Sequence, residues 1–409
     1  MKYLEDIVNK GLCLGCGVCA YSDEIGKTIY SEKRDQFIPL ITKENRQDEV
    51  GYIICPGKGY NIIDESEILY KSAKYDLDLG HVYDHYAAFS NDRQILENAS
   101  SGGIMSHLAI YLLENKIVDR VLTTQFSYKV EPRSVCILAS SREEILKSQG
   151  SKYCPVDLSV AIREIKSNDY TVAIIGTPCQ VAGIRSIQKI DPVFNKKIFI
   201  TIANFCGGFK SYNNINLIAK RKGINPKKIG FFRFRGNGQP GSMLIQETTG
   251  KKVEIPYPKY VGLTGISKHL RCHLCVDATG ELADIACGDA WLPRFLQDIN
   301  PWSIIITRTK KADDLVKKMR GSNMITIQSI SLEEIKSSQH ENLNSKKVRQ
   351  KSRFYLYKKL GFTLPTFDGG FYDYKIRVWT EIKVFTKHKI KSLLEKLGLF
   401  NFFYKLTKK

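Results

Sequence analysis

The chain has 409 residues, of which 43% are hydrophobic and 25% charged, which predicts a globular protein of two or three domains and excludes a disordered chain. The N-terminus, MKYLEDIVNK, carries no apolar signal sequence, and no stretch approaches the roughly 18 apolar residues of a membrane-spanning helix. We therefore expect a cytoplasmic protein with reduced thiols, in which eleven cysteines favour metal binding or catalysis over disulfides.

The formal net charge of +20 is concentrated near the C-terminus. Residues 341–409 contain 17 Lys and Arg against 5 Asp and Glu, a balance of +12, which leaves +8 for the other 340 residues. Because the positive charge is not spread over a folded face, we expect no nucleic acid among the partners.

The first predicted region, residues 1–75, carries cysteines and few regular elements, with a strand pair in 27–41. Its stretch GLCLGCGVCAYSDE places Cys13, Cys16 and Cys19 at two-residue spacers, and Cys55 follows later, directly before a proline. A bacterial ferredoxin loop has this Cys-x2-Cys-x2-Cys run and a distant Cys-Pro dipeptide. The four residues therefore predict a ferredoxin-like 4Fe–4S module, with a structural zinc site as the alternative.

The second predicted region, residues 80–340, alternates between strand-like and helix-like segments, as in an α/β domain with crossover helices. Strands are expected over 118–125, 170–176, 197–205, 281–287 and 302–309, and helices over 102–116, 158–166, 180–189 and 312–321.

Four further cysteines lie in this region: Cys179, Cys206, Cys272 and Cys275. Cys179 and Cys206 follow predicted strands, where α/β sheets place functional groups. Taken singly, Cys179 or Cys206 would more often be a core residue, and spacing alone does not bring the four cysteines together.

The ordered motifs SSGGIMSHLAIYLLENKIVDRV, GSKY, GTPCQVAGIR, FCGG, RCHLC, ELADIACGDAW and WSIIITRT extend over residues 83–340. In this order they resemble the beta-subunit family of coenzyme F420 hydrogenases and dehydrogenases. The resemblance implies an FAD-binding α/β catalytic domain that also carries a 4Fe–4S cluster and passes electrons to a two-electron organic acceptor.

The same resemblance implies the site residues. The cluster ligands fall on Cys179, Cys206, Cys272 and Cys275, and the flavin is expected at Ser100, Ser101, Gly102, Gly103, Ser151, Lys152, Tyr153, Thr177, Pro178 and Gln180. A glycine-rich helix N-terminus offers free N–H groups to a pyrophosphate, which agrees with the SSGG run. A simple helix N-cap remains the alternative for that run.

The candidate catalytic residues are His273, Asp277 and Asp289, with His269 and Glu281 as further proton donors. Each also fits a turn, a cap or the cysteine loop itself. Three cysteines have no assigned role: Cys136, Cys154 and Cys287. A small buried apolar residue is the simplest interpretation of Cys287.

The third predicted region, residues 341–409, is a basic amphipathic helical tail. Apolar residues recur every three to four positions from 375 onward, amid lysines, as in a helix that lies on an anionic membrane surface. The equal alternative is a helix for homo-oligomerisation or domain packing.

We therefore expect an oxidoreductase that relays electrons from a ferredoxin-like donor through two 4Fe–4S clusters to FAD. The expected substrate is a small organic molecule or a glycan precursor, in keeping with family members found in surface-polysaccharide synthesis. The alternatives are a non-catalytic electron-transfer subunit of a larger complex and a zinc-stabilised basic binding protein.

Overall fold

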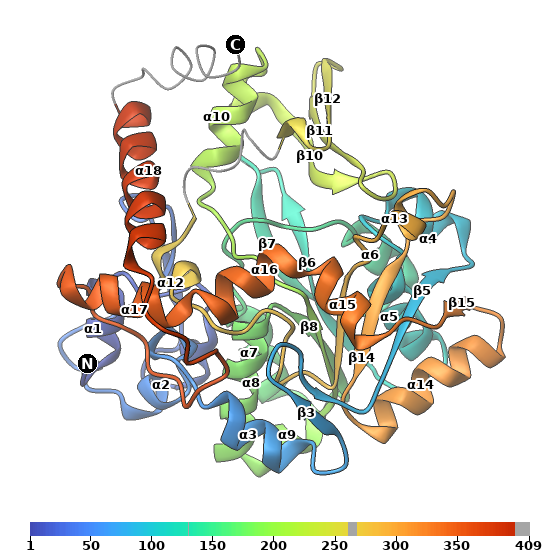
Figure 1. The fold of residues 1–409 in the computed structure, drawn as a ribbon, viewed down its shortest axis with the longest axis horizontal. Helices are drawn as coiled ribbons and strands as arrows, with labels where there is room; N and C mark the ends of the chain where they lie inside the picture. Colours follow the sequence, from blue (N-terminus) through green and yellow to red (C-terminus); the bar gives the residue numbers. More distant parts are fainter. Residues whose placement is uncertain (130, 261–267, 397–409) are drawn as a thin grey trace.

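The centre of the molecule is an eight-stranded mixed sheet, seen in Figure 1. The structure is a computed structural model that describes residues 1–129, 131–260 and 268–396, with the side chains of these residues except 388, 391, 392 and 394–396. The strands run in the order β15-β5-β14-β13-β9-β8-β6-β7. Their bounds are Asp84–Ser90 (β5), Arg120–Ser127 (β6), Arg133–Ala139 (β7), Val172–Gly176 (β8), Ile198–Asn204 (β9), Ile285–Asp289 (β13), Ser303–Thr307 (β14) and Ile325–Gln328 (β15).

The middle strands are parallel and the outer ones antiparallel. β6, β8, β9 and β13 pair in parallel, whereas β7 and the β14-β5-β15 group pair antiparallel. The predicted α/β class is thus correct, and four of the five predicted strands match β6, β8, β9 and β14. The parallel strands bring their carboxyl ends to one edge, where Cys179 follows β8 and Cys206 follows β9.

Helices cover both faces of the sheet. On one face, α5 (Ile104–Glu114) and α14 (Lys310–Gly321) share a core with Val121, Ala173 and Ile285. On the other face, α7 (Ser159–Ser167) and α8 (Pro178–Ile190) pack on Leu122 and Ile174. Neighbouring residues of one strand point to opposite faces, so these apolar strands are buried on both sides.

The strand predicted over 281–287 begins later, at Ile285, which corrects the sequence-based expectation. Glu281 and Asp284 belong instead to the turn before β13. Both carboxylates are committed to buried ion pairs, at 2.5 Å to Lys347 and 3.0 Å to Arg185. Buried carboxylates are tolerated in a protein interior when they are paired with a cation, and both carboxylates of this turn are paired in this way.

The N-terminal region packs on the α7 and α8 face. It comprises α1 (Leu4–Asn9), the 3-10 turn η1 (Val18–Tyr21), the hairpin β1 (Thr28–Ser31) and β2 (Gln36–Pro39), α2 (Glu49–Ile53), the 3-10 turn η2 (Pro56–Lys58) and α3 (Ile62–Leu69). The hairpin confirms the predicted strand pair. Val18, Tyr21 and Ile54 enter the core between the sheet and α7 and α8, so this region is anchored to the domain.

A second, three-stranded antiparallel sheet was not predicted from the sequence. It consists of β10 (Ile229–Gly236), β11 (Ser242–Glu247) and β12 (Lys252–Pro256), and it packs with α10 (Asn213–Arg221). Figure 1 shows it at the top of the molecule. Phe232, Phe234 and Tyr212 form its small core.

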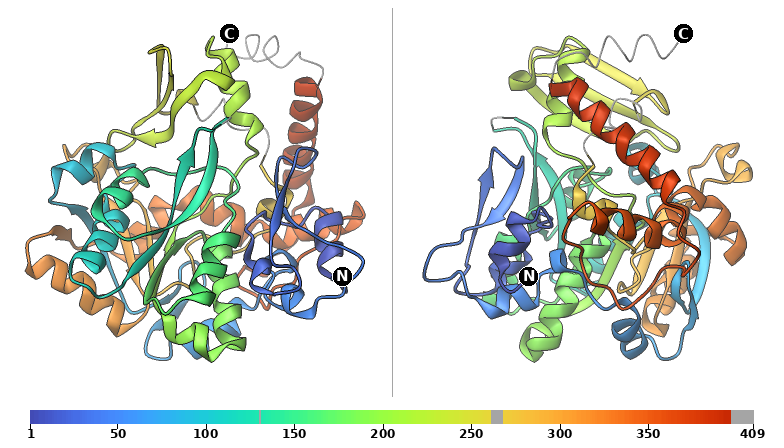
Figure 2. Two further views of the ribbon diagram at one scale, coloured as in Figure 1. Left: turned by 180° about the vertical axis from the view of Figure 1, so that it is seen from behind. Right: turned by 60° about the vertical axis from the view of Figure 1, so that its left-hand side comes forward.

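The C-terminal region is not a single helix. After α15 (Leu332–Ser338), its described part contains α16 (His340–Leu343), a π-helical turn (Asn344–Val348), α17 (Gln350–Lys359) and α18 (Val378–Lys396). Figure 2 shows α17 and α18 beside the N-terminal region. Tyr357, Ile382 and Phe385 share a core with Leu4 and Ile7. None of the described helices has the length and apolar character needed to cross a membrane.

Candidate functional site

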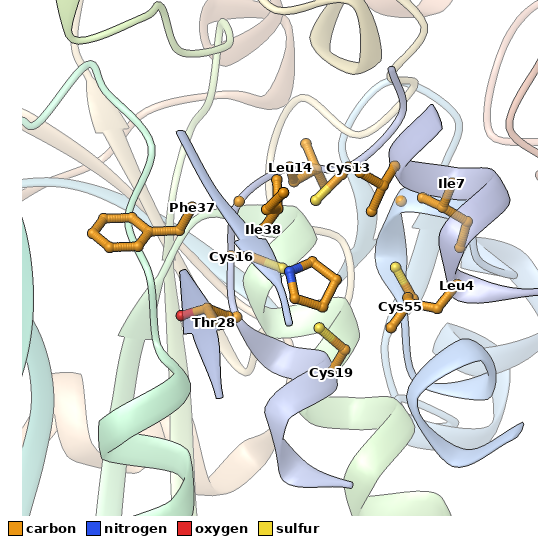
Figure 3. A pocket seen from close by; sticks show the side chains of 15 residues that line it. Leu4, Ile7, Cys13, Leu14, Cys16, Cys19, Thr28, Phe37, Ile38 and Cys55 are labelled. Atoms are coloured by element: carbon orange, nitrogen blue, oxygen red, sulfur yellow. The ribbon is translucent and has the colours of Figure 1, made fainter. Parts of the chain in front are cut away.

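The first cysteine set, Cys13, Cys16, Cys19 and Cys55, lines one cavity (Figure 3). The first three residues follow α1 and enter η1, and Cys55 directly precedes η2. The loop can curl around the cavity because Gly17 has a φ of 69°, and a Cβ there would lie 1.9 Å from an Asp157 carboxylate oxygen. This set was predicted from sequence spacing alone, and the fold brings its members together.

The electrostatics of the first set show that its thiols interact. Burial, and then the nearby Cys55, raise the pKa of Cys13 to about 12. Burial, Cys55 and Cys16 likewise raise the pKa of Cys19. Four thiolates in an apolar cavity repel one another unless a cationic centre binds them, so this donor set fits a metal centre.

Four cysteines that line one cavity can supply the four thiolates that a 4Fe–4S cluster or a structural zinc ion needs.

The second cysteine set is Cys179, Cys206, Cys272 and Cys275. Cys179 lies in the first turn of α8 after β8, and Cys206 lies just after β9. Cys272 lies in α12 (Leu270–His273), and Cys275 follows it. Burial, Cys206, Cys272 and Cys275 together raise the pKa of Cys179 to about 12, so the four thiols are neighbours.

Cys275 differs from the other members of the second set. Although burial opposes it, Lys346 and Arg271 hold the pKa of Cys275 below its usual range. Lys346 Nζ lies 3.6 Å from Cys275 Sγ. A lowered pKa favours the thiolate, which is the form of cysteine that binds metal.

The two cysteine sets adjoin each other. Beyond burial and Cys55, the Cys179 thiol contributes to the raised pKa of Cys16, so a thiol of each set lies within electrostatic reach of the other. Arg271 also joins the segments that carry them, through hydrogen bonds to the carbonyl oxygens of Pro56 and Gly57. Two centres held by these sets would be neighbours in the fold.

The SSGG and GSKY motifs meet in the structure. Ser100 Oγ accepts a hydrogen bond from the Ser151 backbone N–H at 3.3 Å and donates to the Arg235 carbonyl at 3.0 Å. Ser101 Oγ donates to the Trp302 carbonyl at 2.7 Å. Gly103 begins α5 in the left-handed conformation. Both serine side chains thus also hold the loop in place.

Lys152 and Tyr153 line the same region. The Lys152 ammonium donates to the Gln149 and Gly150 carbonyls, both at 2.9 Å, and burial lowers the pKa of Lys152 to about 7. The Tyr153 ring packs at 5.5 Å from the Phe234 ring.

The GTPCQ motif begins α8 at the second cysteine set. The Thr177 backbone N–H donates to Gln180 Oε1 at 2.8 Å, which forms a capping box, and Pro178 occupies the first turn. Thr177 Oγ1 lies 3.3 Å from Cys179 Sγ. The motif therefore positions a thiol. Gln180 Nε2 also donates to the Val156 carbonyl at 3.2 Å, three residues after the GSKY motif.

Sequence reasoning missed Arg235, which lies against SSGG. Arg235 is 2% exposed, and its Nη1 pairs with Asp289 at 2.5 Å. Its Nη2 is buried and has no hydrogen-bond partner among the described residues, and the same holds for the side-chain nitrogens Arg233 Nε, Gln239 Nε2 and Trp302 Nε1. Buried donors without acceptors are rare. A polar or anionic ligand such as FAD beside SSGG would supply those acceptors, so these residues fit the predicted flavin.

The candidate catalytic residues separate into two groups. Asp277 is fully buried and accepts hydrogen bonds from the Gly280 and Glu281 backbone N–H groups, so it caps a turn, as its alternative interpretation predicted. His273 remains beside the second set in α12. Asp289 lies next to SSGG through Arg235, which makes it the member of the trio nearest the predicted flavin.

The other proton-donor candidates have structural partners. Burial lowers the pKa of His269 to about 4, and its Nδ1 accepts from the Arg271 backbone N–H at 3.3 Å. Glu281 is paired with Lys347.

The unassigned cysteines lie in apolar cores. Cys287 packs in the core under α5, and burial alone raises the pKa of Cys287 to about 12. Cys154 packs beside the three-stranded sheet, and Cys136 packs near α7. Cys287 thus has the predicted role of a small apolar residue.

Comparison with known proteins identifies the family. Residues 85–163 match the model of the coenzyme F420 hydrogenase/dehydrogenase beta-subunit N-terminus, and residues 169–333 match that of its C-terminus. The chain is 27% identical over 301 residues to the coenzyme F420 hydrogenase subunit beta of Methanococcus voltae, which covers 68% of this chain and 96% of that protein.

A longer relative covers more of the chain. The coenzyme F420-dependent sulfite reductase of Methanocaldococcus jannaschii is 25% identical over 388 residues, which is 90% of this chain but 56% of that protein. The chain thus spans little more than half of the length of this relative.

One solved structure shares the fold. A chain of the F420-reducing NiFe hydrogenase complex from Methanosarcina barkeri, determined with xenon, aligns with a TM-score of 0.55 at 21% identity, over 71% of this chain and 98% of that chain. The two family models together cover more than half of the sequence, and so this chain belongs to the coenzyme F420 hydrogenase/dehydrogenase beta-subunit family.

Proposed function

We propose that this protein is an iron–sulfur flavoprotein oxidoreductase that relays electrons through two 4Fe–4S clusters to FAD. The first cysteine set would hold the cluster that accepts electrons from a ferredoxin-like donor, and the second set would hold the next one. The observation that carries this proposal is the adjacency of the two sets, with Cys179 within electrostatic reach of Cys16. Curated relatives include a sulfite reductase and subunits of a hydrogenase and a formate dehydrogenase, which supports the redox function.

The second cysteine set is also connected to the predicted flavin residues. The segment after Cys206 runs to Lys210, whose backbone N–H donates to the Tyr153 carbonyl at 3.2 Å. Tyr153 belongs to GSKY, and Ser151 of the same motif bonds to Ser100. Sites for one-electron and two-electron carriers would thus lie along one continuous stretch of structure.

Flavin accepts electrons singly and can hand on a pair, so it would supply the conversion between cluster and substrate chemistry. Around it, Arg235, Gln239 and Trp302 would donate hydrogen bonds from the nitrogens that find no acceptor in the described part of the chain. The Arg235 guanidinium, held by Asp289, would place a fixed positive charge against the flavin. Buried positive charge of this kind stabilises a reduced, anionic ring.

The rival proposal is a non-catalytic electron-transfer subunit. Relatives are named as beta subunits of F420 hydrogenases and of an F420-dependent formate dehydrogenase, which favours work with a partner subunit. Such a subunit would bind the same groups but transfer electrons to a substrate only within its complex. The small organic or glycan-precursor substrate, the polysaccharide setting and the homo-oligomer stay predictions.

The deciding experiment is anaerobic purification of the full chain, with quantification of iron, sulfide, zinc and flavin. Two 4Fe–4S clusters and one FAD require about eight irons and one flavin per chain. Bleaching of both chromophores by reduced ferredoxin would then support the relay. Zinc without flavin would contradict it. Turnover with candidate substrates by the isolated chain would separate the enzyme from the subunit.

A further inference from the structure

Lys346 is a buried lysine that forms no ion pair with a carboxylate of the described residues. Its side chain comes from the π-helical turn and is 2% exposed. Nζ donates to the Asp277 carbonyl oxygen at 2.6 Å and lies 3.6 Å from Cys275 Sγ. Within the described part of the chain, no acidic side chain lies within ion-pair distance of this ammonium.

The neighbouring lysine, Lys347, does form an ion pair with a buried carboxylate. Lys347, the next residue, is fully buried, and its Nζ lies 2.5 Å from the Glu281 carboxylate and 2.7 Å from the Gly370 carbonyl oxygen. Two consecutive lysines thus enter the interior, and one of them meets a carboxylate while the other meets a thiol.

A buried ammonium is destabilising unless negative groups lie nearby. The Asp277 carboxylate accepts hydrogen bonds from backbone N–H groups, and the Asp277 carbonyl oxygen accepts one from Lys346. The second cysteine set lies beside the same ammonium, with Cys275 Sγ at 3.6 Å, and its thiols are thiolates when they bind metal. Together with Asp277, these thiolates would supply the negative charge around Lys346.

The π-helical turn explains how the ammonium reaches the thiol. Such turns are rare, and they occur frequently at functional sites. The turn also lies outside both family models, the second of which ends at residue 333. The charge is therefore supplied by the C-terminal region and not by the family domains.

We propose that Lys346 is a positioning residue that raises the reduction potential of the cluster held by the second cysteine set, an inference that rests on the proposed function. Reduction adds one electron, and hence one negative charge, to a thiolate-bound centre, with the electron coming from the ferredoxin-like donor through the first set. A fixed ammonium against Cys275 stabilises that extra charge, and hydrogen bonds to ligand sulfurs act in the same direction.

The first cysteine set lacks such a contact within the described residues, where no lysine side chain hydrogen-bonds to Cys13, Cys16, Cys19 or Cys55. Burial raises the pKa of Cys55, and the more distant charges of Lys58 and Arg271 act in the opposite direction. The effect of Lys346 should therefore be selective, making the second centre the better electron acceptor. Electrons would then move from the first set to the second with a favourable free-energy change.

The test is an anaerobic redox titration of the full chain, followed by electron paramagnetic resonance. Lys346→Gln keeps a hydrogen-bond donor and removes the charge, Lys346→Met removes both, and Lys346→Arg keeps the charge. Lys310→Gln removes an exposed ammonium on α14 as the matched control. The transition that disappears in Cys272→Ala identifies the second centre.

We expect Lys346→Gln and Lys346→Met to shift that transition to a more negative potential, and the other transition to stay in place. Lys346→Arg and Lys310→Gln should leave both unchanged. Unchanged potentials in a fully iron-loaded Lys346→Gln protein would overturn the inference. So would loss of iron in both neutral variants with retention in Lys346→Arg, since Lys346 would then serve assembly. A wild-type protein without a second transition would contradict the proposed function itself.

Discussion

Arg271 donates a hydrogen bond from Nη2 to the Pro56 carbonyl oxygen at 2.9 Å, and so joins the residue before Cys272 to the residue after Cys55. Its Nε donates to the Gly57 carbonyl at 3.0 Å, and the side chain is fully buried. Because Cys55 belongs to the first cysteine set and Cys272 to the second, one guanidinium fixes the separation between the two sets.

Replacing Arg271 with methionine should lower the free energy of unfolding by about 3 kcal/mol. Two buried carbonyl oxygens would lose their donors, at about 1–3 kcal/mol each. Anaerobic urea denaturation measures the loss. Arg93→Met, at an exposed position of α4 (Arg93–Asn98), is the control and should change stability by less than about 0.5 kcal/mol. Equal losses in the two variants would show that the buried bonds do not matter.

The two cysteine sets should lose iron independently. Cys19→Ala and Cys272→Ala should each remove about four of about eight irons per chain, because each set binds its own cluster. Cys287→Ala should keep them all, since that thiol packs among apolar side chains of the sheet core. Iron and sulfide analysis after anaerobic purification makes the comparison. If Cys287→Ala lost iron, the assignment of the second set would be wrong.

Gly102→Ala should destabilise the SSGG loop. A Cβ at Gly102 would lie 2.4 Å from the Ala88 carbonyl oxygen and 2.8 Å from the Ser303 backbone nitrogen, and neither strand can move away without breaking the sheet. We expect a loss of about 2–3 kcal/mol, as for other forced overpacking, together with a lower flavin content.

Gly321→Ala is the matched control for that substitution. No atom lies within 4 Å of a Cβ placed there, at the end of α14. Its stability should be unchanged or higher by up to about 1 kcal/mol, because alanine favours the helix. Thermal unfolding of both variants distinguishes the clash from a general effect of losing a glycine.

Buried His107 should make stability depend on pH. Its Nδ1 lies 2.8 Å from Ser90 Oγ in the core, and burial lowers the pKa of His107 below its ordinary value of about 6.5, although Asp92 acts in the opposite direction. The unfolded chain thus binds this proton at a higher pH than the folded one does. The stability that His107 contributes is therefore complete above pH 6.5 and is lost as the pH falls through the folded pKa.

The measurement compares the wild type with His107→Gln, which cannot titrate. The free energy of unfolding of the wild type should fall relative to that of the variant as the pH is lowered from 7.5 to 5.5. If the free energies of unfolding of the two proteins changed in parallel with pH, His107 would have the same pKa in the folded and unfolded chains, which would contradict the prediction.

The outer face of α18 should bind anionic membranes. Trp379 is 78% exposed, Leu393 55% and Ile390 52%, while Ile382 and Phe385 face the core. The structure thus supports the domain-packing alternative for the inner face and leaves an exposed apolar stripe amid lysines, as in interfacial helices. Co-sedimentation with phosphatidylglycerol vesicles should be lost on replacing the three exposed residues with serine.

Ile299→Ser is the control for the membrane prediction, because Ile299 is 95% exposed and lies outside α18, between Leu296 and β14. It should leave vesicle binding unchanged. Failure of the wild type to sediment, or equal binding by the triple variant, would contradict a membrane role for α18.

Local patterns predicted much of the fold and the first cysteine set. The parallel strands β6, β8 and β9 are continuous apolar runs, and the helices between them show a helical period, so each element is encoded within its own residues. The Cys-x2-Cys-x2-Cys run is equally local. The three-stranded sheet escaped prediction because its strands carry arginine and glutamate at buried ends, which weakens the alternation.

The second cysteine set and the flavin residues required more than local pattern. Cys179, Cys206 and Cys272 lie tens of residues apart, and family resemblance suggested their grouping. The burial of Arg235 beside the SSGG motif could not be predicted from the sequence, because an arginine in a strand is ordinarily solvent-exposed. Its burial results from the meeting of SSGG with β10 and Asp289.

The sequence by itself determined the α/β class, the ferredoxin-like spacing and the basic C-terminal region, since these depend on neighbours along the chain. Only the tertiary structure decided that Arg271 links the two cysteine sets, that Arg235 lies beside SSGG, and that Lys346 enters the interior. The physical reason is that burial and charge pairing depend on contacts between residues distant in the chain. A lysine-rich segment is predicted to be solvent-exposed, because an unpaired buried charge is costly. Only the structure shows that Lys346 is buried beside a thiol.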